Sequence, residues 1–198
     1  MRRVARLAFA ALIGACLPAY AAELSAAEQK MVQYIDAHAA ESNQLLEKLV
    51  DINSGTFNVD GVRKVAAVLR PEFEALGFKI RWIPMDDVHR AGHLVAERTG
   101  THGKRVLLIG HMDTVFEPSS PFQKFEPKGD TAAGPGSQDM KGGLVIMLYS
   151  LKALQAAGAL DGSITVFLTG DEEHPGDPVS IARRDLVAAA RQNDIALE

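Results

Sequence analysis

At the centre of the sequence lies Leu107-Leu108-Ile109-Gly110-His111-Met112-Asp113-Thr114-Val115, an apolar run that stops at a histidine and an aspartate two residues apart. A short continuous apolar run of this kind is typical of a strand that is buried on both faces. Alternate side chains of a strand point to the same face, so His111 and Asp113 should leave the strand end on one side. The stretch therefore predicts a buried central strand with a polar pair at its carboxyl end.

The rest of the chain alternates between patterns typical of helices and of strands. The 3.6-residue period predicts helices, and strict alternation or a short apolar run predicts strands. The expected helices are 25–50, 62–76, 142–157 and 181–191, and the expected strands are 78–83, 93–97, 105–110, 163–169 and 194–197. This alternation predicts an α/β fold with a mainly parallel sheet and helices on both faces. In such sheets ligands bind at the carboxyl ends of the strands.

The expected helix 62–76 carries its own start, stop and interruption signals. Asp60 can cap its start and Gly77 can end it. Pro71 lies inside it, and a proline removes a helical hydrogen bond. We expect a kink there or two abutting helices.

The first 21 residues have the order of a secretory signal: Arg2, Arg3 and Arg6, an apolar run over 7–17, and the small-residue end Ala19-Tyr20-Ala21. The apolar run is too short to span a bilayer. Cleavage before Ala22 predicts an exported, periplasmic or secreted protein with no stable membrane association. Lipoprotein processing at Cys16 is the alternative.

Composition limits the kinds of ligand that the chain can use. Removing residues 1–21 takes away three arginines and no acid, so the net charge changes from −4 to −7. Nucleic acid is not an expected partner, because its binding requires a basic surface. The single cysteine falls within the expected signal, so the mature chain has no disulfide or thiolate ligand. Histidines and carboxylates remain as metal ligands.

Two further polar clusters lie at the edges of apolar runs. Asp139 lies in the glycine-rich stretch 134–143. One interpretation is that it caps the following helix. The other is that the glycines allow the backbone to pass close to a bound ligand. Three adjacent acids, Asp171-Glu172-Glu173, follow the expected strand 163–169. They form either a solvated loop or a site where a bound cation offsets their mutual repulsion. Zinc binds imidazole and carboxylate ligands, and a second carboxylate can act as general base.

Three motifs carry a resemblance to a known family: H-M-D-T-V at 111–115, G-P-G-S-Q-D-M-K-G-G at 134–143 and T-G-D-E-E at 169–173. In this order and spacing they resemble the co-catalytic zinc aminoacylase and carboxypeptidase family. That family includes glutamate carboxypeptidases, acetylornithine deacetylases and succinyl-diaminopimelate desuccinylases. The resemblance covers residues 30–194, approximately the whole mature chain.

The resemblance implies a hydrolase of amide or peptide bonds with two Zn²⁺ ions, or other divalent ions such as Co²⁺. His111 and Glu173 match ligands to different ions, and Asp139 matches the carboxylate that bridges them. Asp113 matches the residue that orients His111, and Glu172 matches the general base. Lys141, Gly142 and Gly143 match the entry of a helix and a structural role. The implied substrate is a peptide or an N-acyl amino acid.

The family pattern contains features that these 198 residues do not supply. A further acidic ligand should follow the strand that begins at Asp194, where the pattern points to position 200 and Glu198 is the nearest acid. A second histidine ligand, the inserted dimerisation domain and the basic residues that bind a substrate carboxylate are also expected elsewhere. We therefore expect residues 22–198 to be the N-terminal portion of a metallopeptidase catalytic domain, with homodimers expected only of a full-length form.

Three alternatives remain open on the sequence: an inactive product that at most binds zinc, an N-acyl amino acid deacylase, and a plain binding module. The remaining histidines match no motif. We expect His174 at the rim of the site, and we expect four others at the surface: His38, His89, His93 and His102.

Overall fold

The computed structural model describes residues 23–198. The expected signal at 1–21 and the alternative processing site at Cys16 lie outside the described residues. Within the described part of the chain, no helix has the length and apolar character needed to cross a membrane.

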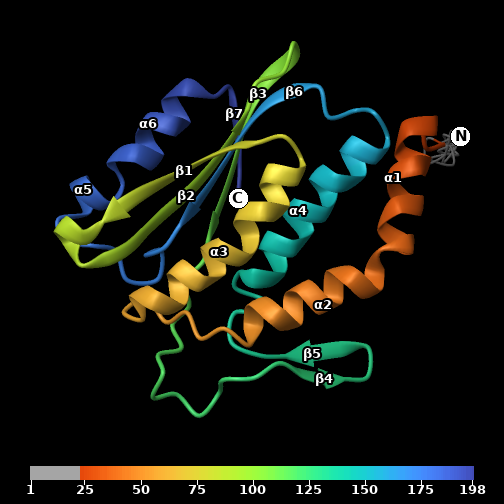
Figure 1. Ribbon diagram of the computed structural model, residues 1–198. Coiled ribbons are helices and arrows are strands. Elements are labelled where there is room, and N and C mark those ends of the chain that lie inside the picture. Colours follow the sequence, from red (N-terminus) through yellow and green to blue (C-terminus); the bar gives the residue numbers. More distant parts are fainter. Residues whose placement is uncertain (1–22) are drawn as a thin grey trace, which may run out of the picture.

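The described residues form a five-stranded sheet in the order β1-β2-β6-β3-β7 (Figure 1). β3 pairs in parallel with β6 and β7, whereas β2 pairs antiparallel with both β1 and β6. The bounds are Lys79–Met85 for β1, Arg90–Arg98 for β2, His102–His111 for β3, Gly162–Thr169 for β6 and Ile195–Leu197 for β7.

The α/β class is confirmed, and the sheet is mixed rather than mainly parallel. β1 and β2 are joined only by the short 3-10 helix η1, Asp86–Val88. A connection this short can join only antiparallel neighbours, because a parallel pair needs a long crossover. The parallel part is the half that contains the stretch around His111.

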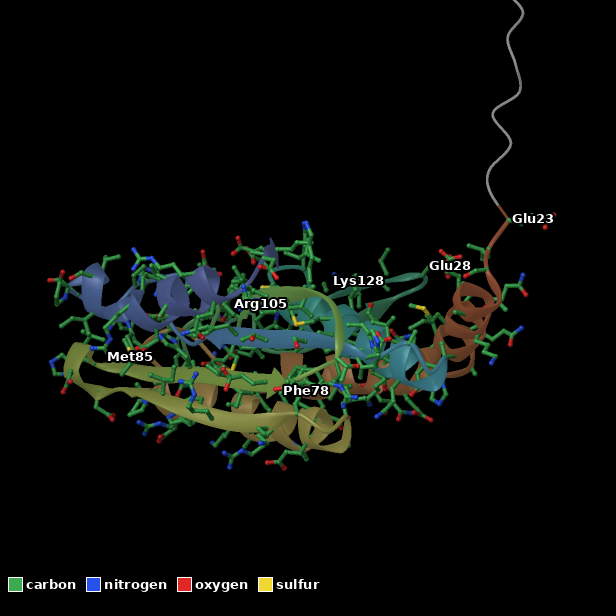
Figure 2. All side chains as sticks on the ribbon, turned by 90° about the horizontal axis from the view of Figure 1, so that it is seen from above. Glu23, Glu28, Phe78, Met85, Arg105 and Lys128 are labelled. Carbon is green, nitrogen blue, oxygen red and sulfur yellow. The ribbon has the colours of Figure 1, made fainter. Side chains whose placement is uncertain are left out.

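Helices cover both faces of the sheet, as expected. α3 (Val59–Ala75) and α4 (Lys141–Ala156) lie on one face, and α1 (Ala26–Ala37) and α2 (Ala39–Val50) pack beside α4. α5 (Val179–Ala182) and α6 (Arg184–Gln192) lie on the other face, and Figure 2 shows α6 and α3 on opposite sides of the strands.

The side chains of β6 show how the two faces divide the core. Val166 and Leu168 belong to the apolar cluster beneath α3 and α4, whereas Phe167 between them belongs to the cluster beneath α5 and α6. All three side chains are fully buried. This is the period-2 alternation of a strand with both faces covered.

Several elements differ in detail from the sequence expectation. The expected helix 25–50 is two helices that meet at His38, whose Nδ1 lies 2.7 Å from the Tyr34 carbonyl oxygen. α3 is one continuous helix through Pro71, and its cap is Asn58 rather than Asp60, because the Asn58 side chain accepts a hydrogen bond from Gly61 N–H. The helix expected at 181–191 begins at Val179 and is interrupted at Arg183.

A short hairpin of β4 (Glu126–Lys128) and β5 (Thr131–Ala133) was not predicted. Each of its strands has three residues, and five of these six residues are exposed. Such strands bury no alternating face, so they leave no periodic signal in the sequence.

The expectation that His93 lies at the surface is wrong. His93 is fully buried beneath α5, with Nε2 3.2 Å from the Ala182 carbonyl oxygen and Nδ1 accepting a hydrogen bond from Gly170 N–H. Burial lowers the pKa of His93, against the opposite effect of the Asp171 charge. His93 is therefore a core histidine with both ring nitrogens satisfied. His89 and His102 are exposed as expected, and His38 is half-buried.

Two neighbouring positions of α4 provide a test of this packing. Leu148 is fully buried, whereas Ile146 is 70% exposed. Leu148→Ala should lower the free energy of unfolding by about 2–5 kcal/mol, because it leaves a cavity between α4 and the sheet. Ile146→Ala should change it by less than about 0.5 kcal/mol. Urea denaturation of both variants measures the difference, and equal losses would contradict the assigned faces of α4.

Candidate metal centre

The carboxyl ends of β3 and β6 bring two of the three motifs together. The strands are parallel and His111 is in register with Thr169. Beyond the strand end, Met112 N–H donates to the Thr169 carbonyl oxygen at 2.8 Å. This pairing places the residues after His111 beside the acidic residues that follow Thr169.

His111 lies between two aspartates. Its Nδ1 is 3.0 Å from the Asp113 carbonyl oxygen and 3.5 Å from the Asp113 carboxylate, while its Nε2 is 2.9 Å from Asp139 Oδ1. Burial lowers the pKa of His111, but hydrogen bonds to Asp113 and Asp139 outweigh that effect and raise it to about 9. With Nδ1–H donating to Asp113, Nε2 is the ring nitrogen available to a metal ion.

The Asp113 carboxylate is fully buried and joins three parts of the chain. It accepts hydrogen bonds from the Thr56 hydroxyl at 2.7 Å, from Glu172 N–H at 3.0 Å and from Glu173 N–H at 3.1 Å. Burial raises the pKa of Asp113, but the adjacent His111 imidazole and these donors hold the pKa below its ordinary value. Asp113 is therefore an ionised anchor beneath the site, and its side chain faces away from the surface.

Thr56 was missed by the sequence reasoning. It lies in the turn 53–56, where a threonine is an ordinary turn residue, so its sequence context gives no signal. The backbone explains its position: Thr114 N–H donates to the Ser54 carbonyl oxygen at 2.9 Å, and Thr56 N–H donates to the Thr114 carbonyl oxygen at 3.1 Å. The turn thus runs beside the chain that leaves β3.

Asp139 lies two residues before the start of α4, and it is not the cap of that helix. The cap position is Met140, and no side chain makes a capping hydrogen bond there. The preceding loop passes close to the strand end: Gly136 has a φ of +74°, and a Cβ at this position would lie 2.7 Å from Thr114 Cγ2. A glycine is required here by both the backbone angle and the lack of space.

Lys141, at the first position of α4, joins the same loop to the segment before α3. Its side chain is fully buried, and Nζ donates to the Ile52 carbonyl oxygen at 2.8 Å. Burial lowers the pKa of Lys141 to about 8, against the charge of Asp51. The expected structural role of Lys141 is consistent with this contact, which joins the Asp139 loop to the segment that carries Thr56.

His111, Asp139 and Glu173 form a group that could hold a metal ion. One ligand atom from each residue lies within 4.8 Å of the other two. Burial raises the pKa of Glu173, and the charges of Asp139, Asp113 and Glu172 raise it further against the effect of His111. A cation would relieve this repulsion, and one imidazole with two carboxylates is a ligand set that suits zinc. The donor set therefore fits the expected ion.

The three adjacent acids have three different surroundings. Asp171 is fully buried and forms an ion pair of 2.7 Å with Arg183, so Arg183 and not a metal offsets its charge. The Glu172 side chain is exposed and lies outside the metal-binding group. Glu173 is half-buried and belongs to that group. Arg183 lies 12 residues away in sequence, and no motif indicated it.

Two other expectations concern the edge of the site. His174 is exposed, with its ring centroid 5.3 Å from that of Phe57, and it is not part of the metal-binding group. The last pair of β7 with β3 is Leu197 with Leu108, which is three residues before His111. Glu198 is not part of the group either.

Comparisons with known proteins agree with the motifs. Residues 107–196 match the model of Peptidase family M20/M25/M40. The chain is 37% identical to carboxypeptidase G2 of Pseudomonas sp. (strain RS-16) over 144 residues, which are 72% of this chain and 34% of that protein. The chain belongs to the M20 family. It spans about a third of the length of the curated relatives that it matches.

Other M20 relatives and structural neighbours extend the comparison. The chain is 34% identical to succinyl-diaminopimelate desuccinylase of Maricaulis maris (strain MCS10) over 113 residues, which are 54% of this chain and 28% of that protein. Human carnosine dipeptidase 1 has a similar fold, with a TM-score of 0.71 and 21% identity over 85% of this chain and 40% of that one. The family resemblance drawn from the motifs is thereby confirmed.

The Thr56 contact can be tested by an isosteric change. Thr56→Val should lower the free energy of unfolding by about 1–3 kcal/mol, because it removes a donor from a buried carboxylate. Thr101→Val, at an exposed threonine, is the matched control and should change it by less than about 0.5 kcal/mol. Guanidinium denaturation without metal measures both, and equal values would show that Thr56 does not support Asp113.

Proposed function

We propose that this chain is part of a zinc-dependent hydrolase of amide or peptide bonds, of carboxypeptidase-like specificity. The observation that carries the proposal is the convergence of His111 Nε2 and the carboxylates of Asp139 and Glu173 at the carboxyl edge of the sheet. Membership of the M20 family and the similarity to carboxypeptidase G2 support the same reaction class.

Each site residue has a proposed part in the reaction. His111, Asp139 and Glu173 would hold two divalent ions, zinc or an ion such as cobalt, with Asp139 shared between them. Bound zinc supplies a Lewis acid that polarises the substrate carbonyl and acidifies water. Asp113 orients His111 through Nδ1, at the distances given above. Glu172 is free of the ligand group, so it can take the proton from water and pass it to the leaving amine.

The proposed substrate is a peptide or an N-acyl amino acid. A deacylase is the second candidate, and it is favoured by the similarity to succinyl-diaminopimelate desuccinylases. We also propose export to the periplasm or beyond the cell, on the pattern of residues 1–21, and homodimers of a full-length form. The competing hypothesis is a chain that binds zinc without turnover, because the matched residues cover only about a third of the length of its relatives.

Metal binding is the first test. The chain dialysed against zinc should retain it, and Asp139→Ala should lose most of it, because the proposed shared carboxylate is removed. Asp130→Ala, in the exposed turn of the β4–β5 hairpin, is the control and should bind as the unmodified chain does. Elemental analysis gives the zinc content per chain. A zinc-free unmodified chain would overturn the proposed metal centre.

The role of Glu172 gives the second test. Glu172→Gln should keep the zinc content of the unmodified chain and lose about 10²–10⁴-fold in turnover of dipeptides and N-acyl amino acids, because a general base is removed. Glu126→Gln, on the exposed strand β4, should leave both unchanged. Surviving activity in Glu172→Gln would refute this base. Zinc binding without turnover in the unmodified chain would support the inactive alternative instead.

A further inference from the structure

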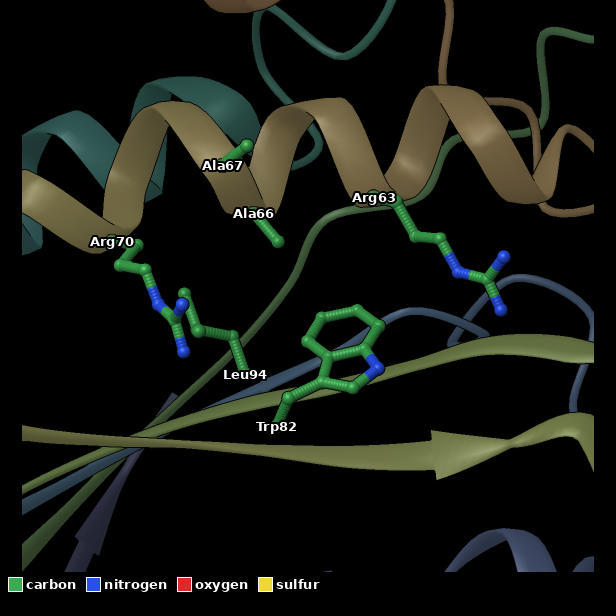
Figure 3. A pocket seen from close by; sticks show the side chains of 6 residues that line it. All are labelled: Arg63, Ala66, Ala67, Arg70, Trp82 and Leu94. Atoms are coloured by element: carbon green, nitrogen blue, oxygen red, sulfur yellow. The ribbon is translucent and has the colours of Figure 1, made fainter.

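A recess of about 300 Å³ lies between α3 and the edge of the sheet formed by β1 and β2 (Figure 3). It is lined by residues of α3, β1 and β2, and none of them belongs to the candidate metal centre. These lining residues are Arg63, Ala66, Ala67, Arg70, Trp82 and Leu94.

The spacing of the α3 residues explains why the recess exists. Positions 63, 66, 67 and 70 follow the i, i+3, i+4, i+7 pattern of one helical face. The two middle positions are alanines, which leave space above the strands. The floor is Leu94, which is 2% exposed and is the cross-strand partner of Trp82.

A glycine on β2 makes room for the Trp82 indole beside this floor. Gly92 has a φ of +120°, and a Cβ at this position would lie 2.7 Å from Cζ2 of the indole. The ring therefore packs against the β2 backbone at Gly92, and Figure 3 shows it standing between the strands and α3. The recess thus has an aromatic wall and an aliphatic floor.

The two arginines give the recess a positive rim. Figure 3 shows their side chains extending from α3 toward the level of the strands, one on each side of Trp82. Their present partners are weak: Arg63 pairs with Asp86 at 3.1 Å and Arg70 with Glu74 at 3.7 Å, and all four side chains are 44–70% exposed. Exposed ion pairs of this kind contribute little stability, so a bound anion can replace the carboxylates.

We propose that this recess binds a small organic carboxylate with an aromatic or branched aliphatic body. The apolar body lies against Trp82 and Leu94 beneath the alanines, and the carboxylate pairs with Arg63 or Arg70. Apolar lining with a few charged groups at the rim is typical of small-molecule sites, and arginine is well suited to carboxylates. The site is separate from the proposed metal centre, and it does not depend on hydrolase activity.

The chain contains its own reporter for this site, because Trp82 is its single tryptophan. With EDTA present, titration of the 198-residue chain with 3-phenylpropionate should change the fluorescence of Trp82 saturably. The neutral analogue 3-phenylpropanol should bind about fivefold more weakly, as expected for one exposed charge pair. Acetate, which has no apolar body, should cause no change.

Variants test whether the ligand binds in this recess and not elsewhere on the chain. Arg63→Gln combined with Arg70→Gln should remove the preference for the acid over the alcohol, and Ala67→Leu should fill the recess and abolish the saturable response. Arg81→Gln is the matched control. It changes an exposed arginine on β1, the strand that carries Trp82, and should bind as the unmodified chain does. Circular dichroism checks that each variant is folded. No saturable response, equal binding of acid and alcohol, or an unchanged response in the double variant would overturn the proposal.

Discussion

The buried carboxylate of Asp113 is the interaction on which the rest of the site depends. A buried charge is costly unless donors surround it, and here these donors come from two segments that lie far from Asp113 in the sequence. The Thr56 hydroxyl comes from the turn before α3, and the N–H groups of Glu172 and Glu173 come from the loop after β6. One anion thus fixes the positions of both loops relative to β3, and it can reach them only because β3 and β6 are parallel neighbours.

This anchoring divides the site into a rigid half and an accessible half. The Asp113 side chain is fully buried and that of His111 is 5% exposed, whereas the Asp139 side chain is 75% exposed. Nε2 of His111 lies 2.9 Å from Asp139 Oδ1, and the hydrogen bonds to Asp113 and Asp139 raise the pKa of His111 to about 9 against the effect of burial. A proton and a metal ion compete for this nitrogen, so metal binding here is expected to release a proton.

Hydrophobic periodicity predicted most helices and strands, and the motifs predicted the residues that lie together in the candidate metal centre. The strand ends at His111 and Thr169, the helix α4 and the group of His111, Asp139 and Glu173 follow from such signals. The support beneath the site does not, because Thr56 and Arg183 act through contacts between segments far apart in the chain. His93 was misplaced for the same reason: its burial depends on α5, which packs over it from a later part of the sequence.

The helix that follows the Thr56 turn also forms one wall of the recess between α3 and the β1–β2 edge of the sheet. The helix begins three residues after Thr56, and its first turn is capped by Asn58. Its fully buried residues Val62, Val65 and Leu69 pack on the sheet, and they leave positions 63, 66, 67 and 70 to face the β1 edge. The space of the recess comes from the two alanines at the middle positions of this face, which lie over Trp82 and Leu94. α3 therefore connects the two places in the chain: the turn before it carries the Thr56 contact with Asp113, and one of its faces lines the recess.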